Sequence, residues 1–104
     1  MSAVIVVATA FPVPEHKAEV VAAFEAAIAH VHGAEPGCEF YALHEGQDRL
    51  VMIEKYASQD AVAEHIKGAG LAGLRAALEG KLSSPIDVQV LVPHPAGTAS
   101  KGAL

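Results

Sequence analysis

Five polar side chains of this 104-residue sequence combine residue types that do chemistry with positions inside apolar segments: His65, Tyr56, Thr9, His44 and Arg75. An imidazole titrates near neutral pH, so a histidine can act there as a general base. A phenol or hydroxyl can donate a hydrogen bond to a substrate oxygen, and a guanidinium can bind an anionic group. The chemistry available to each residue depends on the face of the helix or strand that it occupies.

His65 is the first candidate for a catalytic residue. It shares one face of an expected helix with Ala61, Val62 and Ile66, so its side chain projects from the buried side of that helix. An imidazole in this position can serve as a general base near neutral pH. The alternative is a histidine at the helix edge that bonds to a backbone carbonyl.

Each of the other four candidates also has a structural alternative. Tyr56 can donate a hydrogen bond to a substrate oxygen, or close the end of the sheet with its hydroxyl in water. Thr9 can line the floor of a pocket, or bond within the sheet. Tyr41 and His44 lie on opposite faces of one strand because their separation is odd; we expect His44 to face the pocket and Tyr41 to face a partner. Arg75 can bind an anionic substrate, or occupy an exposed position on its helix.

The six histidines do not form a metal-binding motif. His30 and His32 are two residues apart and diverge around a helix, and the sequence has no HExxH pattern or Cys/His cluster. Cys38 is better explained as a small buried hydrophobic residue than as a nucleophile. Gly68 and Gly70 do not follow a strand, so they lack the context of a dinucleotide-binding loop. We expect neither a metal nor a cofactor.

The elements that must position these residues follow from hydrophobic periodicity and from turn residues. A strand rich in Val and Ile stops at Pro12, and a helix follows whose apolar residues recur every three or four positions until Gly33. Gly46-Gln47-Asp48 reverses the chain between two strands, and Gly68 and Gly70 divide the second helix. The expected strands are 3–11, 38–45, 50–56 and 86–92. The expected helices are 15–32, a short helix that follows an N-cap at Ser58 and ends near Lys67, and 71–82.

This β-α-β-β-α-β order predicts an α+β, ferredoxin-like fold with a four-stranded antiparallel sheet and both helices on one face. The strands carry apolar residues on both faces, so the face opposite the helices also requires a cover. A second copy of the chain is the simplest cover, which predicts a homodimer in the form of a dimeric α+β barrel. Residues 1–92 form the domain, and residues 93–104 are expected to be a flexible tail or an arm on the partner.

Composition excludes several other classes of protein. Hydrophobic residues make up 52% and charged residues 18%, which is more apolar material than a small monomer easily buries. The net charge is −5 and the seven Lys and Arg are scattered, which argues against a nucleic-acid partner. The apolar N-terminal segment is too short to span a membrane and lacks the cationic start of a signal peptide. A single cysteine suits a reducing cytoplasm.

Several segments occur in an order that is typical of one family: AEPGC at 34–38, FYALHEG at 40–46, VMIEKY at 51–56, AVAEHIKGAGLAGLRAAL at 61–78, and a closing strand that ends in Val-Pro. Through them the chain, from Ala3 to Val92, resembles the antibiotic biosynthesis monooxygenase superfamily of small dimeric α+β barrels. The resemblance implies a quinol-monooxygenase-like protein that binds a flat phenolic substrate between sheet and helices. It also implies oxidation by O₂ without flavin, haem or metal, begun by loss of a substrate proton.

The sequence departs from the family pattern at three places. Tyr56 stands where the family usually has Trp, and Gly68-Ala69-Gly70 stands where it usually has Ser-Pro-His. The Asn, Trp and His of the haem-degrading branch align with Thr9, His65 and Arg75, which makes haem degradation an unsuitable function. Two alternatives to a monooxygenase remain open: a non-catalytic dimeric barrel that binds a small apolar metabolite, and an isomerase-like member of the same fold.

Overall fold

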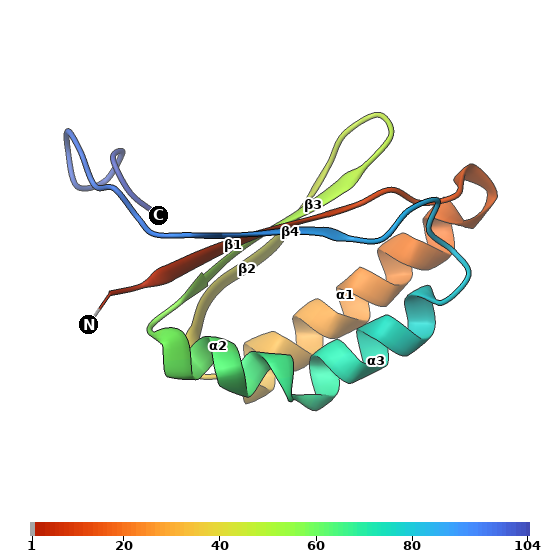
Figure 1. Ribbon diagram of the computed structural model, residues 1–104, viewed down its shortest axis with the longest axis horizontal. Coiled ribbons are helices and arrows are strands. Elements are labelled where there is room, and N and C mark those ends of the chain that lie inside the picture. The colour runs from red at the N-terminus through yellow and green to blue at the C-terminus, as the bar shows by residue number, and fades with distance from the viewer. Residues whose placement is uncertain (1) are drawn as a thin grey trace.

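The computed structural model describes residues 2–104 and has the predicted β-α-β-β-α-β order, with the second helix in two pieces. The sheet is antiparallel throughout, in the order β2-β3-β1-β4, and the helices all lie on one side of it (Figure 1). The predicted ferredoxin-like α+β fold is therefore confirmed. The elements are β1 Val4–Ala10, η1 Pro14–His16, α1 Lys17–Ala34, β2 Cys38–Glu45, β3 Leu50–Tyr56, α2 Gln59–Ile66, α3 Ala69–Leu78 and β4 Asp87–Leu91.

Helix α1 packs on the sheet through the apolar stripe that its sequence predicts. Its four buried residues are spaced three or four apart, namely Val20, Phe24, Ala27 and Val31. The helix continues through Gly33 to Ala34, so the predicted stop at Gly33 is wrong. Gly33 does not adopt the left-handed conformation that a glycine helix terminus uses, because only Gly80 and Gly97 have positive φ among residues 2–104.

The second helix is divided as predicted, but its second piece is shorter. Ser58 caps α2 by accepting a hydrogen bond from the Ala61 amide at 3.2 Å. Helix α3 ends at Leu78 rather than near residue 82, because the chain turns at Gly80, whose φ is +76°. Leu82 consequently lies outside the helix, where it forms a single bridge with Pro12 and packs against the core.

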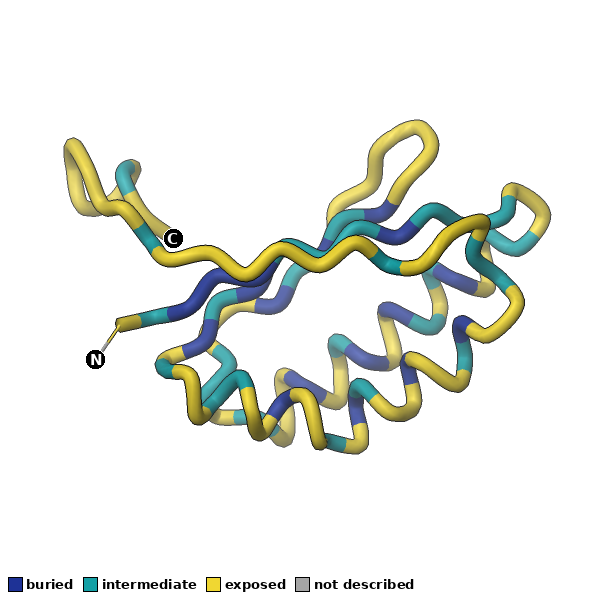
Figure 2. The backbone as a smooth tube through the Cα atoms, viewed as in Figure 1, coloured by how far each residue is buried: buried dark blue, intermediate teal, exposed yellow. Residues whose placement is uncertain are grey.

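The two faces of the sheet differ in their cover. Residues opposite each other in an antiparallel sheet project to the same side, so the pairs of β1 and β3 define the faces. The helix-facing residues of β3 alternate with its outer ones and are all buried, namely Leu50, Met52, Glu54 and Tyr56. On the outer face, Val7 pairs with Ile53 and both are partly exposed, while Phe40 is 39% exposed. Figure 2 shows that β4 is exposed along its whole length. The outer face is therefore apolar and uncovered in one chain.

Residues 93–104 follow β4 without forming a further helix or strand. They turn back at Thr98–Gly102, where the Gly102 amide donates to the Thr98 carbonyl, and Lys55 Nζ donates to the Leu104 carbonyl at 2.7 Å. Figure 1 shows this segment projecting beyond one end of the sheet. The flexibility expected for it stays a prediction. None of the helices within residues 2–104 has the length and apolar character needed to cross a membrane.

Candidate active site

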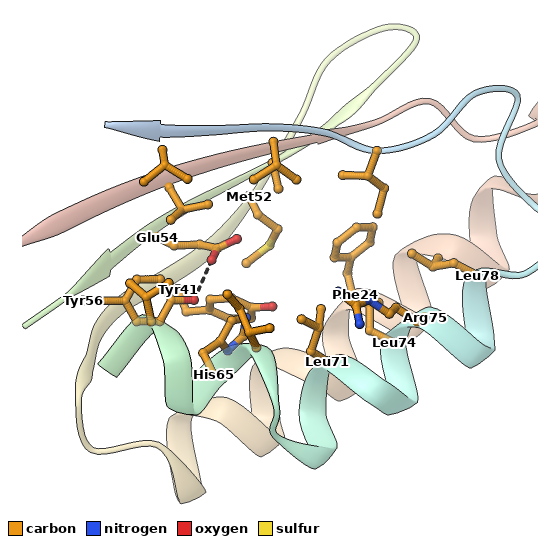
Figure 3. A pocket seen from close by; sticks show the side chains of 17 residues that line it. Phe24, Tyr41, Met52, Glu54, Tyr56, His65, Leu71, Leu74, Arg75 and Leu78 are labelled. Carbon is orange, nitrogen blue, oxygen red and sulfur yellow. Dashed lines mark hydrogen bonds between the residues drawn. The ribbon is translucent and has the colours of Figure 1, made fainter. Parts of the chain in front are cut away.

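A cavity of about 390 Å³ lies between the helix-facing side of the sheet and the three helices. Most of its walls are apolar, and its polar residues lie at two ends. Figure 3 shows Glu54, Tyr56, Tyr41 and His65 together at one end and Arg75 toward the other, with Met52 and Leu71 between them. The remaining lining residues are Val6, Ala8, Phe24, Val62, Ile66, Leu74, Leu78, Ile86, Val88 and Val90. An apolar site with a few convergent polar groups is the usual form of a small-molecule site.

Strand β3 supplies one pair of the polar end. Glu54 and Tyr56 are two residues apart on the buried face of β3, and the Tyr56 hydroxyl donates to Glu54 Oε1 at 2.6 Å. Burial raises the pKa of Glu54, and the hydrogen bond from Tyr56 only partly opposes this rise. Burial, together with the Glu54 charge, also raises the pKa of Tyr56. Tyr56 therefore remains a neutral phenol whose proton is already engaged.

Helix α2 supplies the imidazole of His65, which is 6% exposed. Its Nδ1 lies 2.7 Å from Oε1 of Glu35, the residue that follows the last turn of α1. A carboxylate oxygen accepts hydrogen bonds, so Nδ1 is assigned as the donor of this contact, and Nε2 makes no hydrogen bond to any residue within 2–104. The rings of Tyr41 and Tyr56 pack against the imidazole at centroid distances of 5.4 and 5.2 Å. His65 is thus a buried imidazole of fixed orientation on the wall of the cavity.

The structure brings together three of the five side chains that the sequence singled out. His65, Tyr56 and Arg75 line the cavity, whereas Thr9 and His44 do not. Thr9 and His44 both pair with Val51, and all three lie on the outer face of the sheet. The predictions that Thr9 lines the pocket floor and that His44 faces the pocket are therefore wrong, because both residues lie on the opposite face of the sheet. Side chains alternate between the two faces of a strand, so the neighbours Ala8 and Leu43 face the helices instead.

Tyr41 takes the place expected for His44. It is 3% exposed, and its register with Glu54 places it on the helix-facing side. Figure 3 shows its hydroxyl pointing into the cavity, and this hydroxyl makes no hydrogen bond to any residue within 2–104. Burial raises the pKa of Tyr41, so the phenol keeps its proton. Tyr41 is consequently the neutral donor that is free to meet a ligand, which Tyr56 is not.

Two carboxylates of the site were missed by the sequence analysis. Glu54 carried a signal in the sequence. It occupies the same every-second positions of the strand as Leu50, Met52 and Tyr56, so it had to share their buried face. Glu35 carried none, because it meets His65, which is 30 residues away in sequence, only in the folded chain. Acidic residues are rarely buried without a partner, and each of these two has one at the polar end.

Arg75 gives the other end of the cavity a positive charge. It lies near the C-terminal end of α3, and it forms no ion pair with any residue between 2 and 104. Lys67, in contrast, pairs with Glu64 at 2.9 Å. Arg75 is exposed, so the exposed helix position that the sequence offered as its alternative is confirmed, and the residue lines the edge of the cavity as well.

Cys38 and the metal-binding residue types form no second site within residues 2–104. Burial raises the pKa of the Cys38 thiol to about 11, so it remains protonated at neutral pH and is a poor nucleophile. Cys38 Sγ donates a hydrogen bond to the Phe40 carbonyl at 3.4 Å. Within residues 2–104, no three His, Cys, Asp or Glu side chains are grouped to hold a metal ion.

The fold and the cavity define the class of this protein: a ferredoxin-like α+β domain with an apolar cavity between its sheet and helices. The family model described as antibiotic biosynthesis monooxygenase matches residues 3–76. The chain belongs to the antibiotic biosynthesis monooxygenase family, as its sequence motifs predicted.

Individual relatives agree with this assignment. "Putative monooxygenase Rv0793" of Mycobacterium tuberculosis is 35% identical, over 88% of this chain and 92% of that protein. The structure of Rv0793 superposes with a TM-score of 0.83 at 33% identity, covering 94% of this chain and 99% of that one. A Caulobacter crescentus structure, described as a putative antibiotic biosynthesis monooxygenase, gives a TM-score of 0.82 at 28% identity, covering 86% and 88%.

Proposed function

We propose that this protein is a cofactor-independent monooxygenase that oxidises a small aromatic, quinol-like substrate with O₂. Membership of a monooxygenase family supports the reaction class. The observation that carries the proposal is the polar end of the apolar cavity, where an oriented imidazole and a free phenol face the same space. A flat aromatic ring fits walls built from Leu, Val, Met and Phe side chains.

His65 is the proton acceptor in this proposal. The carboxylate of Glu35 holds the Nδ1 proton, so the lone pair of Nε2 is available to the phenolic proton of the substrate. Tyr41 donates a hydrogen bond to the resulting phenolate oxygen, because its hydroxyl has no other partner within residues 2–104. Tyr56 supports the site through Glu54 instead of contacting the substrate oxygen as a donor.

The substrate supplies all the electrons of the oxidation. A phenol with an unsubstituted para carbon loses its O–H and C–H bonds, one oxygen atom of O₂ becomes a new carbonyl, and the other leaves as water with both protons. The phenolate is electron-rich enough to react with O₂ directly, and the apolar walls offer it few competing proton donors. His65 returns its proton to the departing oxygen, so the protein ends the cycle unchanged.

Arg75 narrows the substrate class. Its position toward the opposite end of the cavity favours an aromatic compound that carries a phenolic hydroxyl at one end and a carboxylate or similar anion at the other (Figure 3). The apolar residues between the two ends accommodate the rings.

Oxygen uptake with a panel of hydroxylated naphthalenes and anthracenes, with and without a carboxylate, tests the proposal. We expect uptake with one ¹⁸O atom from labelled O₂ in the quinone product, unchanged by a metal chelator and abolished in His65→Ala. His44→Ala is the matched control, because this histidine lies on the outer face of the sheet. A folded protein without uptake on the whole panel, or a fully active His65→Ala variant, contradicts the proposal.

A second candidate function is the binding of a small metabolite without turnover. The observation that favours it is the internal pairing of the polar end, where Tyr56 bonds to Glu54 and His65 to Glu35. A ligand that raises the melting temperature and is recovered unaltered supports binding alone. An isomerase-like reaction uses the same proton acceptor, and it is recognised by product formation without oxygen uptake.

We further propose that two chains associate through the outer faces of their sheets to form a dimeric barrel. Support comes from the apolar residues that this face leaves partly or fully exposed, notably Val7, Phe40, Ile53 and Leu91. An apolar sheet face with no cover is the usual mark of an interface. A second copy offers the same face in return and leaves the cavity on the other side of each sheet free for substrate.

A further inference from the structure

Glu35 occupies an unusual position for a carboxylate at the end of a surface helix. It follows α1 directly, and its side chain is only 13% exposed. One oxygen, Oε1, accepts the hydrogen bond from His65 Nδ1 at 2.7 Å. The other, Oε2, is buried and has no hydrogen-bond partner among residues 2–104. A buried polar atom without a partner is costly, so its presence calls for a role that outweighs this cost.

The break in the second helix makes room for this carboxylate. A Cβ atom added to Gly68 would lie 3.4 Å from Glu35 Oε2, and one added to Gly70 would lie 3.6 Å from Oε2 and 2.8 Å from His30 Cδ2. Helix α3 begins beside Oε2 with no side-chain cap and no acidic residue in its first turn. Oε2 of Glu35 therefore lies near the N-terminal end of α3, the end of a helix at which the backbone dipole favours negative charge.

The Glu35–His65 pair also joins two separate spaces. His65 lines the 390 Å³ cavity but not the hollow of about 340 Å³ on the other side of α2, whereas Glu35 lines that hollow but not the cavity. The carboxylate therefore reaches the imidazole from behind and takes up no room that a ligand needs. Tyr41 and Tyr56 hold the ring from two other directions.

We propose that Glu35 is a positioning residue: its charged carboxylate fixes the Nδ1–H tautomer of His65, presents Nε2 to the cavity as the proton acceptor, and stabilises the imidazolium that forms. This inference rests on the proposed function for its kinetic consequence, although the tautomer itself is independent of turnover. When the phenolic O–H bond breaks, its proton forms a bond to Nε2. The Nδ1 proton stays shared with Glu35, and the ring carries the positive charge beside a fixed negative one.

Two substitutions at Glu35 test this role in the 104-residue protein. ¹⁵N NMR of the imidazole reports the tautomer without any substrate, and we expect the Nδ1–H form in the wild type. Glu35→Gln keeps an acceptor but loses the charge, so the tautomer is retained while kcat falls. Glu35→Leu removes both, so the Nδ1–H form is lost and kcat falls roughly 10²-fold with KM unchanged. Glu64→Gln is the control, because Glu64 lines the same hollow yet is exposed and pairs with Lys67.

The outcomes separate this inference from the proposed reaction. If no phenol is oxidised by the wild type, the proposed function fails, and the tautomer in wild type and Glu35→Leu still decides the positioning role. If Glu35→Leu keeps the Nδ1–H form, or if it oxidises the substrate at the wild-type kcat, the inference is overturned. A kcat that falls in Glu35→Gln and falls further in Glu35→Leu, with KM constant, supports the inference. If Glu35 had only a structural role, loss of its charge alone would not lower kcat.

Discussion

The Tyr56 hydroxyl donates a 2.6 Å hydrogen bond to Glu54 Oε1, the carboxylate two residues earlier on the same face of β3. Both side chains are buried, at 0% and 5% exposure, so each satisfies a polar atom of the other where water does not reach. One strand thus builds a polar pair of its own at one end of an apolar cavity. This pair contributes to the stability of the fold, and the raised pKa of Glu54 makes part of that stability depend on pH.

Removing the Tyr56 hydroxyl leaves Glu54 Oε1 buried without its donor. We expect Tyr56→Phe to lower the free energy of unfolding by about 1–3 kcal/mol, the usual cost of an unsatisfied buried group. Urea denaturation measures this change. Tyr41→Phe is the matched control and should cost less, because the Tyr41 hydroxyl has no hydrogen-bond partner within residues 2–104. Equal losses in the two variants would contradict the assigned role of the pair.

Replacing Glu54 by Gln should stabilise the protein, and the effect should grow with pH. Burial raises the pKa of Glu54 in the folded state above its ordinary value of 4.5, so the folded chain holds this proton more tightly than the unfolded chain. The protonated Glu54 carboxyl stabilises the folded chain fully at pH values below the pKa that Glu54 has in the unfolded chain. This stabilisation is lost as pH rises through the higher pKa of Glu54 in the folded chain. Gln retains an acceptor for Tyr56 and never ionises.

Melting curves of wild type and Glu54→Gln between pH 4 and pH 8 check this expectation. The two melting temperatures should converge at the acidic end and diverge toward neutral pH, with the variant higher. A constant difference across the range would show that Glu54 does not carry the pH dependence.

A methyl group at Gly37 should displace the start of α2. A Cβ atom there would lie 2.7 Å from Ala61 Cβ, four residues before His65, so Gly37→Ala should cost about 1–3 kcal/mol through overpacking. Gly33→Ala is the opposite case, because no atom lies within 4 Å of its added Cβ and the residue is helical. It should stabilise the protein by up to about 1 kcal/mol. Thermal denaturation of both variants compares them, and a stable Gly37→Ala would refute the packing argument.

A charge in the centre of the outer sheet face should prevent association. Ile53 pairs with both Val7 and Ala42 on this face, so Ile53→Lys would bury an ammonium group in the proposed interface. Light scattering should report twice 10.7 kDa for the wild type and 10.7 kDa for the variant. Ala26→Lys, on the exposed side of α1, should stay dimeric. A monomeric wild type would remove the proposed dimer altogether.

Loss of the Arg75 charge should affect anionic substrates selectively. A charged hydrogen bond contributes roughly 1.5–3 kcal/mol, so Arg75→Gln should raise KM for a carboxylated phenol by about tenfold or more. KM for the uncharged parent phenol should not change. Lys67→Gln is the control, because Lys67 is exposed and lies outside the cavity lining. A rise in KM for both phenols would assign Arg75 to the shape of the cavity instead of to charge recognition.

The sequence predicted the fold closely because its local signals agree with one another. Strand β1 stops before Pro12, Ser58 caps α2, and the glycines at 68 and 70 divide the second helix as expected. His65 also lies on the buried side of α2, as its helical neighbours indicated. These features depend on short stretches of chain, and short-range preferences are what a sequence pattern records.

The arrangement of side chains across the sheet was harder to predict. Both faces are apolar, so hydrophobic alternation could not assign Thr9 or His44 to a side. The register with β3 decides the question: Tyr41 faces Glu54 and not the solvent side. Glu35, the residue after α1, meets His65 of α2 across 30 residues of sequence, and no local pattern contains this contact. The missing parts of the site are those that tertiary contacts create.

The interruption between α2 and α3 has one more consequence. His65 and Arg75 belong to two separate helical segments, with Lys67 and Gly68 between them. The distance between the polar end and the cationic end of the cavity therefore depends on the backbone at this break. Under the proposed function, a change in the bend at residues 67–68 would alter the length of the ligand that both ends can contact. The residues at either end, and so the chemistry they offer, would stay the same.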